Sequence, residues 1–382
     1  MTIYNLISFT GIFVLAFVAW LLSSDRKTVN WRVVAWGIGL QLLFAFFVFV
    51  VPAGTKIFLF INDAVVKVLD SAQAGTRFIF GRLALPAGAT NEFGETSLGN
   101  FLMFQGLATI IFFAALIGAL YHAGIMPFFI RLFSRVFTKT MGISGAESLS
   151  VSSNIFVGVE SSLVVKPHLS DMTLSELTTI ITAGMATIAS TVLAVYVIFL
   201  NRLLPTIAGH LVSASIIAAP ASIVMAKLIM PETGRPRTLG LEVKPHYERE
   251  DNIMVAVING ANDGLKLLGG IVALLLAVLG LLALLDMILS WAGGGLNTLF
   301  GLHFEWSLKS LFGYVLYPLT ALLGLPPADI LPVSKLLGER AVATEVVAYQ
   351  HLADLMARGG LTSVRSAIIA SYALCGFAHF AS

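Results

Sequence analysis

The sequence predicts an all-α protein embedded in a membrane. Of its 382 residues, 57% are hydrophobic and only 12% are charged, whereas soluble domains average about 25% charged residues. Four long windows lack Asp, Glu, Lys and Arg altogether: Val33–Val51, Phe104–Tyr121, Leu177–Leu200 and Leu267–Leu285. Each can cross about 30 Å of hydrocarbon as a helix. A soluble protein with buried helices explains them poorly, because soluble helices rarely lack charge for so long.

The composition excludes several other classes of protein. The net charge of +2 says little about partners, but no basic block is dense enough to indicate nucleic-acid binding. A single cysteine, Cys375, rules out an internal disulfide and a cysteine metal cluster. The sequence contains no G-x-S-x-G, H-E-x-x-H or G-x-x-x-x-G-K-[ST] motif, so we expect no enzymatic activity.

Seven crossings are expected along the chain, the last beginning near Ser366. The first six are Leu6–Leu22, Val33–Val51, Phe104–Tyr121, Leu174–Leu200, Leu211–Met230 and Leu267–Leu285. Arg26, Lys27 and Arg32 follow the first crossing, which places that loop inside and the N-terminus outside. After the sixth crossing, "SWAGGGLNTLFGLHFEW" has no Lys or Arg, and we expect an outside loop there.

Three segments are predicted to lie at the membrane surface. "KIFLFINDAVVKVLDSAQAGTRFIFGRL" and "MPFFIRLFSRVFTKTMG" are apolar at roughly helical spacing with charges between, which is typical of interfacial amphipathic helices. "SLFGYVLYPLTALLGLPPAD" is apolar but bent at Pro318, and we interpret it as an interfacial helix on the outside.

Two further stretches, Gly142–His168 and Leu331–Met356, are too polar for lipid-facing helices. Irregular backbone at membrane depth is tolerated where it lines a cavity, so both are predicted to be re-entrant hairpins. The fourth crossing carries "GMATIAST", whose small and hydroxylated residues suit close packing or a broken helix.

These elements form an inverted repeat. Crossing three, an interfacial helix, a hairpin and crossings four and five make one unit, and crossing six, an interfacial helix, a hairpin and crossing seven begin the same unit from the other side. This architecture is common in secondary transporters. We therefore divide the chain into N-terminal spans (1–102), scaffold span three (103–141), the first hairpin with spans four and five (142–230), an inner loop with scaffold span six (231–327), and the second hairpin with span seven (328–382).

Two carboxylates fall near the middle of the hairpins, Glu160 and Glu345. A charge at membrane depth costs at least about 2.5 kcal/mol, so such residues usually face a cavity or a partner. We favour a role as substrate or ion ligands. The alternatives are structural ion pairs, of Glu345 with Lys335 or Arg340 and of Glu160 with Lys166.

Other polar residues have simpler interpretations. Asp263 and Lys266 stand three apart, and a surface ion pair is the favoured interpretation. For His379 two interpretations stay open: a hydrogen-bonded core histidine, or a group that donates to substrate or carries a proton.

The stretches "NIFVGVESSLVVKPHL", "ERAVATEVVAY" and "ALCGFAHF" resemble the concentrative nucleoside transporter family. That family has a G-Q-T-E hairpin tip, an N-E-F-V-A-Y second tip and a C-G-F-A-N run ending in Ser. The resemblance covers nearly the whole chain and follows the bacterial eight-span topology, so it implies a further span beyond this sequence. It implies a homotrimer in the bacterial inner membrane, with no resident cofactor. Each protomer would import nucleosides by alternating access, driven by sodium or protons.

The resemblance also implies site residues. The ribose ligands would be Glu345, His379 and Ser382, with Phe377 matching the aromatic of the C-G-F run. The base would face the first hairpin tip, at Val159, Glu160 and Ser161. The sodium ligands would be Asn154, Val157, Thr187 and Ile188.

The sequence departs from the family at the tip itself. Val159 replaces the Gln, the hairpin carboxylate comes one residue early at Glu160, Thr344 replaces an Asn, and His379 replaces another. Base preference therefore does not carry over, because a site that changes its hydrogen-bonding partners discriminates differently. A modified nucleoside or a nucleobase is the alternative substrate, and a gated channel or receptor is a more distant alternative. Sodium and proton coupling both stay open.

Overall fold

The chain is helical throughout the residues that the structure describes. The structure is a computed structural model that describes residues 3–91, 93–246, 250–301 and 304–380. Within these residues, extended pairing is limited to two isolated bridges, Thr90 with Thr96 and Ser144 with Leu239. The all-α class is thereby confirmed.

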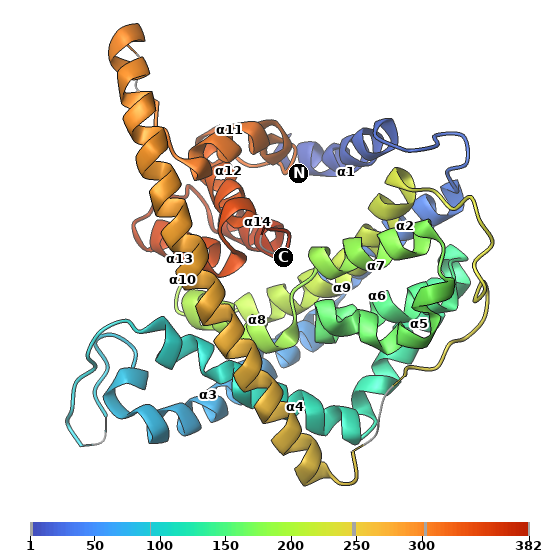
Figure 1. Cartoon of the computed structure of the whole chain (residues 1–382), viewed down its shortest axis with the longest axis horizontal. Coiled ribbons are helices and arrows are strands. Elements are labelled where there is room, and N and C mark those ends of the chain that lie inside the picture. The colour runs from blue at the N-terminus through green and yellow to red at the C-terminus, as the bar shows by residue number, and fades with distance from the viewer. Residues whose placement is uncertain (1–2, 92, 247–249, 302–303, 381–382) are drawn as a thin grey trace. The chain divides into compact units, whose positions relative to one another are not determined.

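Within the described residues, fourteen α-helices and three other helical segments follow one another (Figure 1). The α-helices are α1 Ile3–Leu21, α2 Trp31–Phe49, α3 Pro52–Phe80, α4 Thr109–His122, α5 Ile125–Met141, α6 Gly145–Val157, α7 Leu174–Ala186, α8 Ser190–Leu200, α9 Ile207–Ile229, α10 Ile253–Phe300, α11 Leu308–Ala321, α12 Pro327–Val342, α13 Glu345–Ala357 and α14 Val364–Leu374. The other segments are η1 Gly81–Ala84, η2 Met103–Leu107 and η3 Val159–Asp171.

Six helical stretches among the described residues are long and apolar enough to cross a membrane. They are Ile3–Leu21, Trp31–Phe49, Met103–His122, Leu174–Leu200, Ile207–Ile229 and Ile253–Leu299. Each overlaps one of the first six predicted crossings. The seventh prediction corresponds to α14, a shorter apolar helix of 11 residues.

The predicted outside loop after the sixth crossing is wrong in part. The helix continues through Gly293, Gly294 and Gly295 to Phe300, and α10 is 48 residues long (Figure 1). Gly costs about 1 kcal/mol relative to Ala in a helix, but the returning chain packs on one of the three glycines, Gly293. The Trp306 indole lies against Gly293 and donates to Asn297 Oδ1 at 3.0 Å.

The chain divides into two compact units, residues 19–270 and residues 1–18 with 271–382. In the first unit, α4 and α10 approach closely because glycines face the partner backbone. A Cβ on Gly118 would lie 2.7 Å from the Ala256 carbonyl oxygen, and one on Gly260 would lie 2.7 Å from that of Ala114. Small residues commonly allow such approaches between membrane helices. In the other unit, Gly313 on α11 and Gly338 on α12 likewise allow the backbones of these two helices to approach closely.

Three segments break where polar residues meet small ones. Gly158 separates α6 from η3 with φ +83°, a conformation that glycine adopts without strain. Thr187, Ile188 and Ala189 separate α7 from α8, so the broken helix suggested by "GMATIAST" is present. Ala343 and Thr344 separate α12 from α13.

Candidate functional site

Two half-helices, α6 and α7, lie side by side and run in the same direction. At their starts, Ser144 Oγ donates to Glu176 Oε1 at 2.5 Å. At their ends, Asn154 Nδ2 donates to Thr187 Oγ1 at 2.5 Å and also to the Ala183 carbonyl. Both helix ends therefore meet at Asn154.

Local sequence fixes where both helices begin. Ser144 caps α6, because its hydroxyl accepts a hydrogen bond from the Glu147 N–H at 3.2 Å. Thr173 and Glu176 form a reciprocal capping box at the start of α7. Such caps satisfy backbone donors that would otherwise lack partners and contribute about 1 kcal/mol each.

The cluster around Asn154 is fully buried and rich in oxygen atoms. Asn154 and Thr187 have no exposed surface, and Ser161 is 1% exposed. Thr187 Oγ1 donates to the Asn154 carbonyl at 3.3 Å, and Ser161 Oγ donates to Asn154 Oδ1 at 3.4 Å. Helix C-termini carry partial negative charge, and transporters use such half-helix ends and unwound carbonyls to hold Na⁺. The cluster is chemically suited to a small, hard cation.

The other residues predicted for the first hairpin lie nearby in the chain. Val157 ends α6, and Ile188 is fully buried in the break after α7. Val159 and Glu160 begin η3, but their side chains lie outside the part of the chain that the structure describes. The alternative pair of Glu160 with Lys166 therefore stays untested.

A second cluster lies in the other unit, around the break between α12 and α13. Glu345 begins α13 and is 3% exposed. His379 Nε2 lies 3.4 Å from Glu345 Oε2. Phe377 is half-buried close by in sequence, and Ser382 lies outside the described residues. A buried carboxylate beside an imidazole can accept hydrogen bonds from sugar hydroxyls.

The cations named as alternative partners of Glu345 also contact other groups. Lys335 Nζ pairs with Glu305 Oε2 at 2.5 Å. Arg340 Nη1 donates to the Ala373 carbonyl at 2.7 Å, at the end of α14. The predicted surface pair is present, with Lys266 Nζ 2.9 Å from Asp263 Oδ1 and both side chains exposed.

Sequence reasoning missed a third cluster, in which Lys227 on α9 pairs with Glu147 on α6 at 2.7 Å. Both side chains are buried. The signal was present, because Lys227 lies inside the predicted crossing Leu211–Met230. An ionisable residue within a membrane span needs a named partner.

The loop after α9 holds the first hairpin at its surface end. Gly145 N donates to the Thr238 carbonyl at 2.9 Å, and Arg237 Nη1 pairs with Asp171 Oδ2 at 2.7 Å. Further along, Arg135 on α5 pairs with Glu242 at 2.8 Å. That exposed pair lowers the pKa of the Glu242 carboxyl, chiefly through the hydrogen bond from the guanidinium.

Three family models together match most of the chain. Residues 10–83 match the "Na+ dependent nucleoside transporter N-terminus", residues 103–203 match "Nucleoside recognition", and residues 210–382 match the "Na+ dependent nucleoside transporter C-terminus". A solved structure of CNTnw in an inward-facing, substrate-bound state is similar along the same length. It shares 32% sequence identity with a TM-score of 0.86, over 99% of this chain and 87% of that one. The chain belongs to the concentrative nucleoside transporter family.

Members of this family with curated names are also similar. Solute carrier family 28 member 3 of Mus musculus is 36% identical over 99% of this chain and 52% of its own length. Sodium/nucleoside cotransporter 2 of Rattus norvegicus is 34% identical over 99% of this chain and 56% of its own. The chain thus spans about half the length of these mammalian relatives. The second of these names is that of a cotransporter and the matching family models describe a nucleoside transporter, in agreement with the expectation of a transporter rather than an enzyme.

The family assignment confirms the resemblance drawn from the three motifs and the multi-pass membrane fold. A variant of CNTnw solved in an outward-facing state has a TM-score of 0.86 and 31% identity with this chain, covering 100% of this chain and 87% of that one. This fold therefore occurs in both outward- and inward-facing states.

Proposed function

We propose that this chain imports nucleosides across the bacterial inner membrane by alternating access, coupled to sodium. The observation that carries the proposal is the buried oxygen cluster at Asn154, where α6 and α7 end together. The sodium-dependent family and the names of its cotransporter members support it.

The ion would bind among the oxygens of the first unit. We assign Asn154, Val157, Thr187 and Ile188 to this role. The side-chain hydroxyl of Thr187 and backbone carbonyls at the two breaks would replace the water around Na⁺. The ion would also compensate the partial negative charges of two helix ends, and that compensation orders the first hairpin.

The nucleoside would bind at the residues that the family motifs imply. Glu345, His379 and Ser382 would hold the ribose with Phe377 against it, and Val159, Glu160 and Ser161 would face the base. In the described cluster, a sugar hydroxyl entering beside Glu345 takes the place of the imidazole as partner of the carboxylate. Hydrogen bonds to a carboxylate are worth about 1.5–3 kcal/mol, so Glu345 would supply much of the affinity.

The rest of the chain would support the movement of this site. We assign residues 142–230 and 328–382 to the moving part. The scaffold comprises residues 103–141 and 231–327, with residues 1–102 as the N-terminal spans. The assembly would be a homotrimer with each N-terminus outside, and each protomer would carry its own site.

The decisive experiment is uptake of labelled uridine and adenosine into proteoliposomes with an imposed gradient. We expect uphill, saturable accumulation with a sodium gradient and little with a proton gradient. Equal sodium on both sides is the matched control. Accumulation driven only by protons would overturn the choice of ion, and no gradient-dependent uptake of either nucleoside would overturn the function.

A second candidate substrate class follows from one observation. Val159 stands where the family has an amide that hydrogen-bonds the base, so a modified nucleoside or a free nucleobase is the alternative. Competition against labelled uridine separates the two. Ribose-bearing competitors should block uptake in the first case, and free bases should block it in the second.

A further inference from the structure

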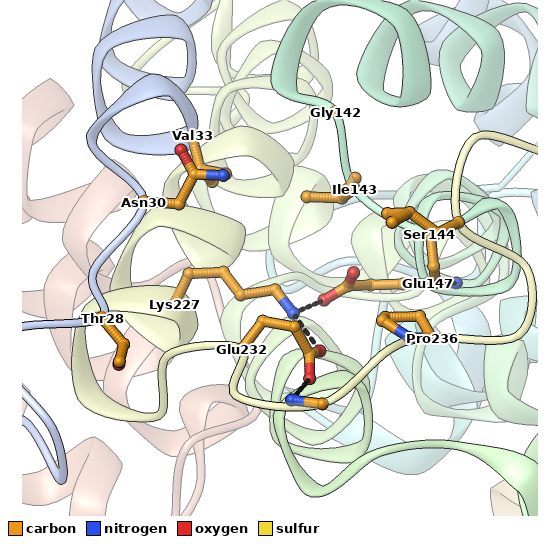
Figure 2. Close-up of a pocket in the computed structure, with 12 residues that line it drawn as sticks. Thr28, Asn30, Val33, Gly142, Ile143, Ser144, Glu147, Lys227, Glu232 and Pro236 are labelled. Carbon is orange, nitrogen blue, oxygen red and sulfur yellow. Dashed lines mark hydrogen bonds and ion pairs between the residues drawn. The ribbon is translucent and has the colours of Figure 1, made fainter.

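Lys227 is a buried lysine near the end of an apolar helix. It lies on α9, only 5% exposed, in the sequence "VMAKLIM". Its ammonium is 2.7 Å from Glu147 Oε1, donates to Ser175 Oγ at 2.9 Å and lies 3.6 Å from Glu232 Oε2. Figure 2 shows the side chain extended toward Glu147, with Glu232 below it. Burying a charge costs several kcal/mol unless it is well paired, so this arrangement needs a reason.

Each partner of the ammonium belongs to a different part of the first unit. Glu147 lies on α6, the first leg of the hairpin, and is 1% exposed. Ser175 lies in the first turn of α7 and donates onward to the Met230 carbonyl at 2.7 Å. Glu232 accepts a hydrogen bond from Thr173 Oγ1 at 2.8 Å. One ammonium therefore joins the starts of α6 and α7 to the end of α9. We call Lys227, Glu147, Ser175 and Glu232 the lysine clasp.

The lysine clasp and the oxygen cluster lie at opposite ends of the same two helices. Glu147 and Asn154 are seven residues apart on α6, which is two turns or about 10 Å along one face. The residues of α6 from Gly145 to Ile155 are all buried. A packed helix moves as a rigid body, because interiors have few voids. A shift of α6 against α7 at the clasp is therefore transmitted to the spacing of Asn154 and Thr187.

We propose that Lys227 is a positioning residue for the candidate sodium site: its ammonium fixes the starts of α6 and α7, and thereby sets the distance between Asn154 and Thr187. The inference rests on the proposed function, since it concerns the affinity of that site for its coupling ion. Lys227 does not touch the ion. It acts through the two half-helices that supply the ligands.

A cavity beside the clasp makes the proposal testable without unfolding the protein. Its volume is about 420 Å³, and its lining includes Glu147, Lys227 and Glu232 of the clasp together with Thr28, Asn30, Ser144 and Pro236 (Figure 2). A cavity of this size whose lining includes charged and hydroxyl-bearing side chains holds water. Water can therefore solvate Glu147 when the ammonium is removed, and a neutral variant at 227 should still fold.

The experiment compares sodium activation of uridine uptake with sodium-dependent thermal stabilisation of the purified protein. For K227M we expect the half-maximal sodium concentration to rise about tenfold, which corresponds to 1.4 kcal/mol, in both measurements. The uridine KM at saturating sodium should stay within about twofold of wild type. K227R keeps the charge and the donors, so it should restore sodium activation to within about threefold.

A double variant separates positioning from charge balance. K227M/E147Q removes the uncompensated carboxylate, so it should recover the sodium-free melting temperature while its sodium activation stays weak. K266M is the matched control, because Lys266 forms an exposed pair with Asp263 and should change nothing. Wild-type sodium activation in K227M, or its return in the double variant, would overturn the proposal. If wild-type protein shows no sodium-driven uptake and no stabilisation by sodium, the proposed function itself fails.

Discussion

Replacing Thr187 with valine tests the candidate sodium site with the smallest change in shape. Valine keeps the volume and removes one hydroxyl. That hydroxyl accepts from Asn154 Nδ2 at 2.5 Å and donates to the Asn154 carbonyl at 3.3 Å, and both residues are fully buried. In the variant, the Asn154 side-chain amide keeps the Ala183 carbonyl as an acceptor but loses the Thr187 hydroxyl. The buried carbonyl of Asn154 loses the hydroxyl that donated to it. An unsatisfied buried group costs about 1–3 kcal/mol, so we expect the sodium-free melting temperature to fall by several degrees.

The loss of a sodium ligand adds a second, separable effect. We expect the half-maximal sodium concentration for uptake to rise by about tenfold or more, and the rise of melting temperature with added sodium to disappear. Differential scanning fluorimetry of purified protein in sodium and in potassium chloride measures the melting temperatures. Uridine uptake at increasing sodium concentration measures the half-maximal value. T178V is the matched control, because Thr178 lies on α7, the helix that ends just before Thr187, and its hydroxyl donates to the Leu174 carbonyl at 2.8 Å. If T187V kept a wild-type sodium response, Thr187 would be no ligand and the assigned site would be wrong.

Three further predictions address the second cluster and the hairpin break. E345Q should lower uridine uptake about a hundredfold, because the ribose loses its charged acceptor, whereas E305Q at an exposed pair should leave uptake near wild type. When His379 is protonated, it holds Glu345 in an ion pair that the sugar must displace. The uridine KM should therefore rise as pH falls in wild-type protein and stay flat in H379N; parallel profiles would exclude this role. G158A should lower the melting temperature by an amount worth more than about 1 kcal/mol, because φ is +83° there. G39A, in an open helical position of α2, should not lower it.

The crossings could be predicted because they depend on properties that sum over many residues. Val33–Val51 was predicted and Trp31–Phe49 observed, a shift of two residues that the cap at Asn30 explains. The half-helices were also predictable, since Gly158 and the small residues before Ser190 interrupt otherwise helical runs. Composition and spacing within the chain were sufficient for both.

The contacts between distant segments could not be read in this way. The helical path through Gly293 depends on Trp306, and the pairing of Lys227 with Glu147 joins residues 80 apart in the chain. The sequence offers only its neighbours Lys335 and Arg340 as alternative partners of Glu345, and it gives no sign that His379, which follows α14, lies 3.4 Å from the carboxylate. Side-chain partners of this kind follow from tertiary packing, which a single sequence does not determine.

The hydrogen bonds of the oxygen cluster also determine that it can bind the cation of a salt but not the anion. Both N–H groups of the Asn154 amide are directed to protein oxygens, and the hydroxyls of Thr187 and Ser161 donate back to Asn154. Because these donors already form hydrogen bonds within the protein, an anion in the cluster would face only the lone pairs of oxygen atoms and would be repelled. Replacing chloride with a bulky organic anion should therefore leave activation unchanged, because the counter-ion has no access to a proton in this cluster.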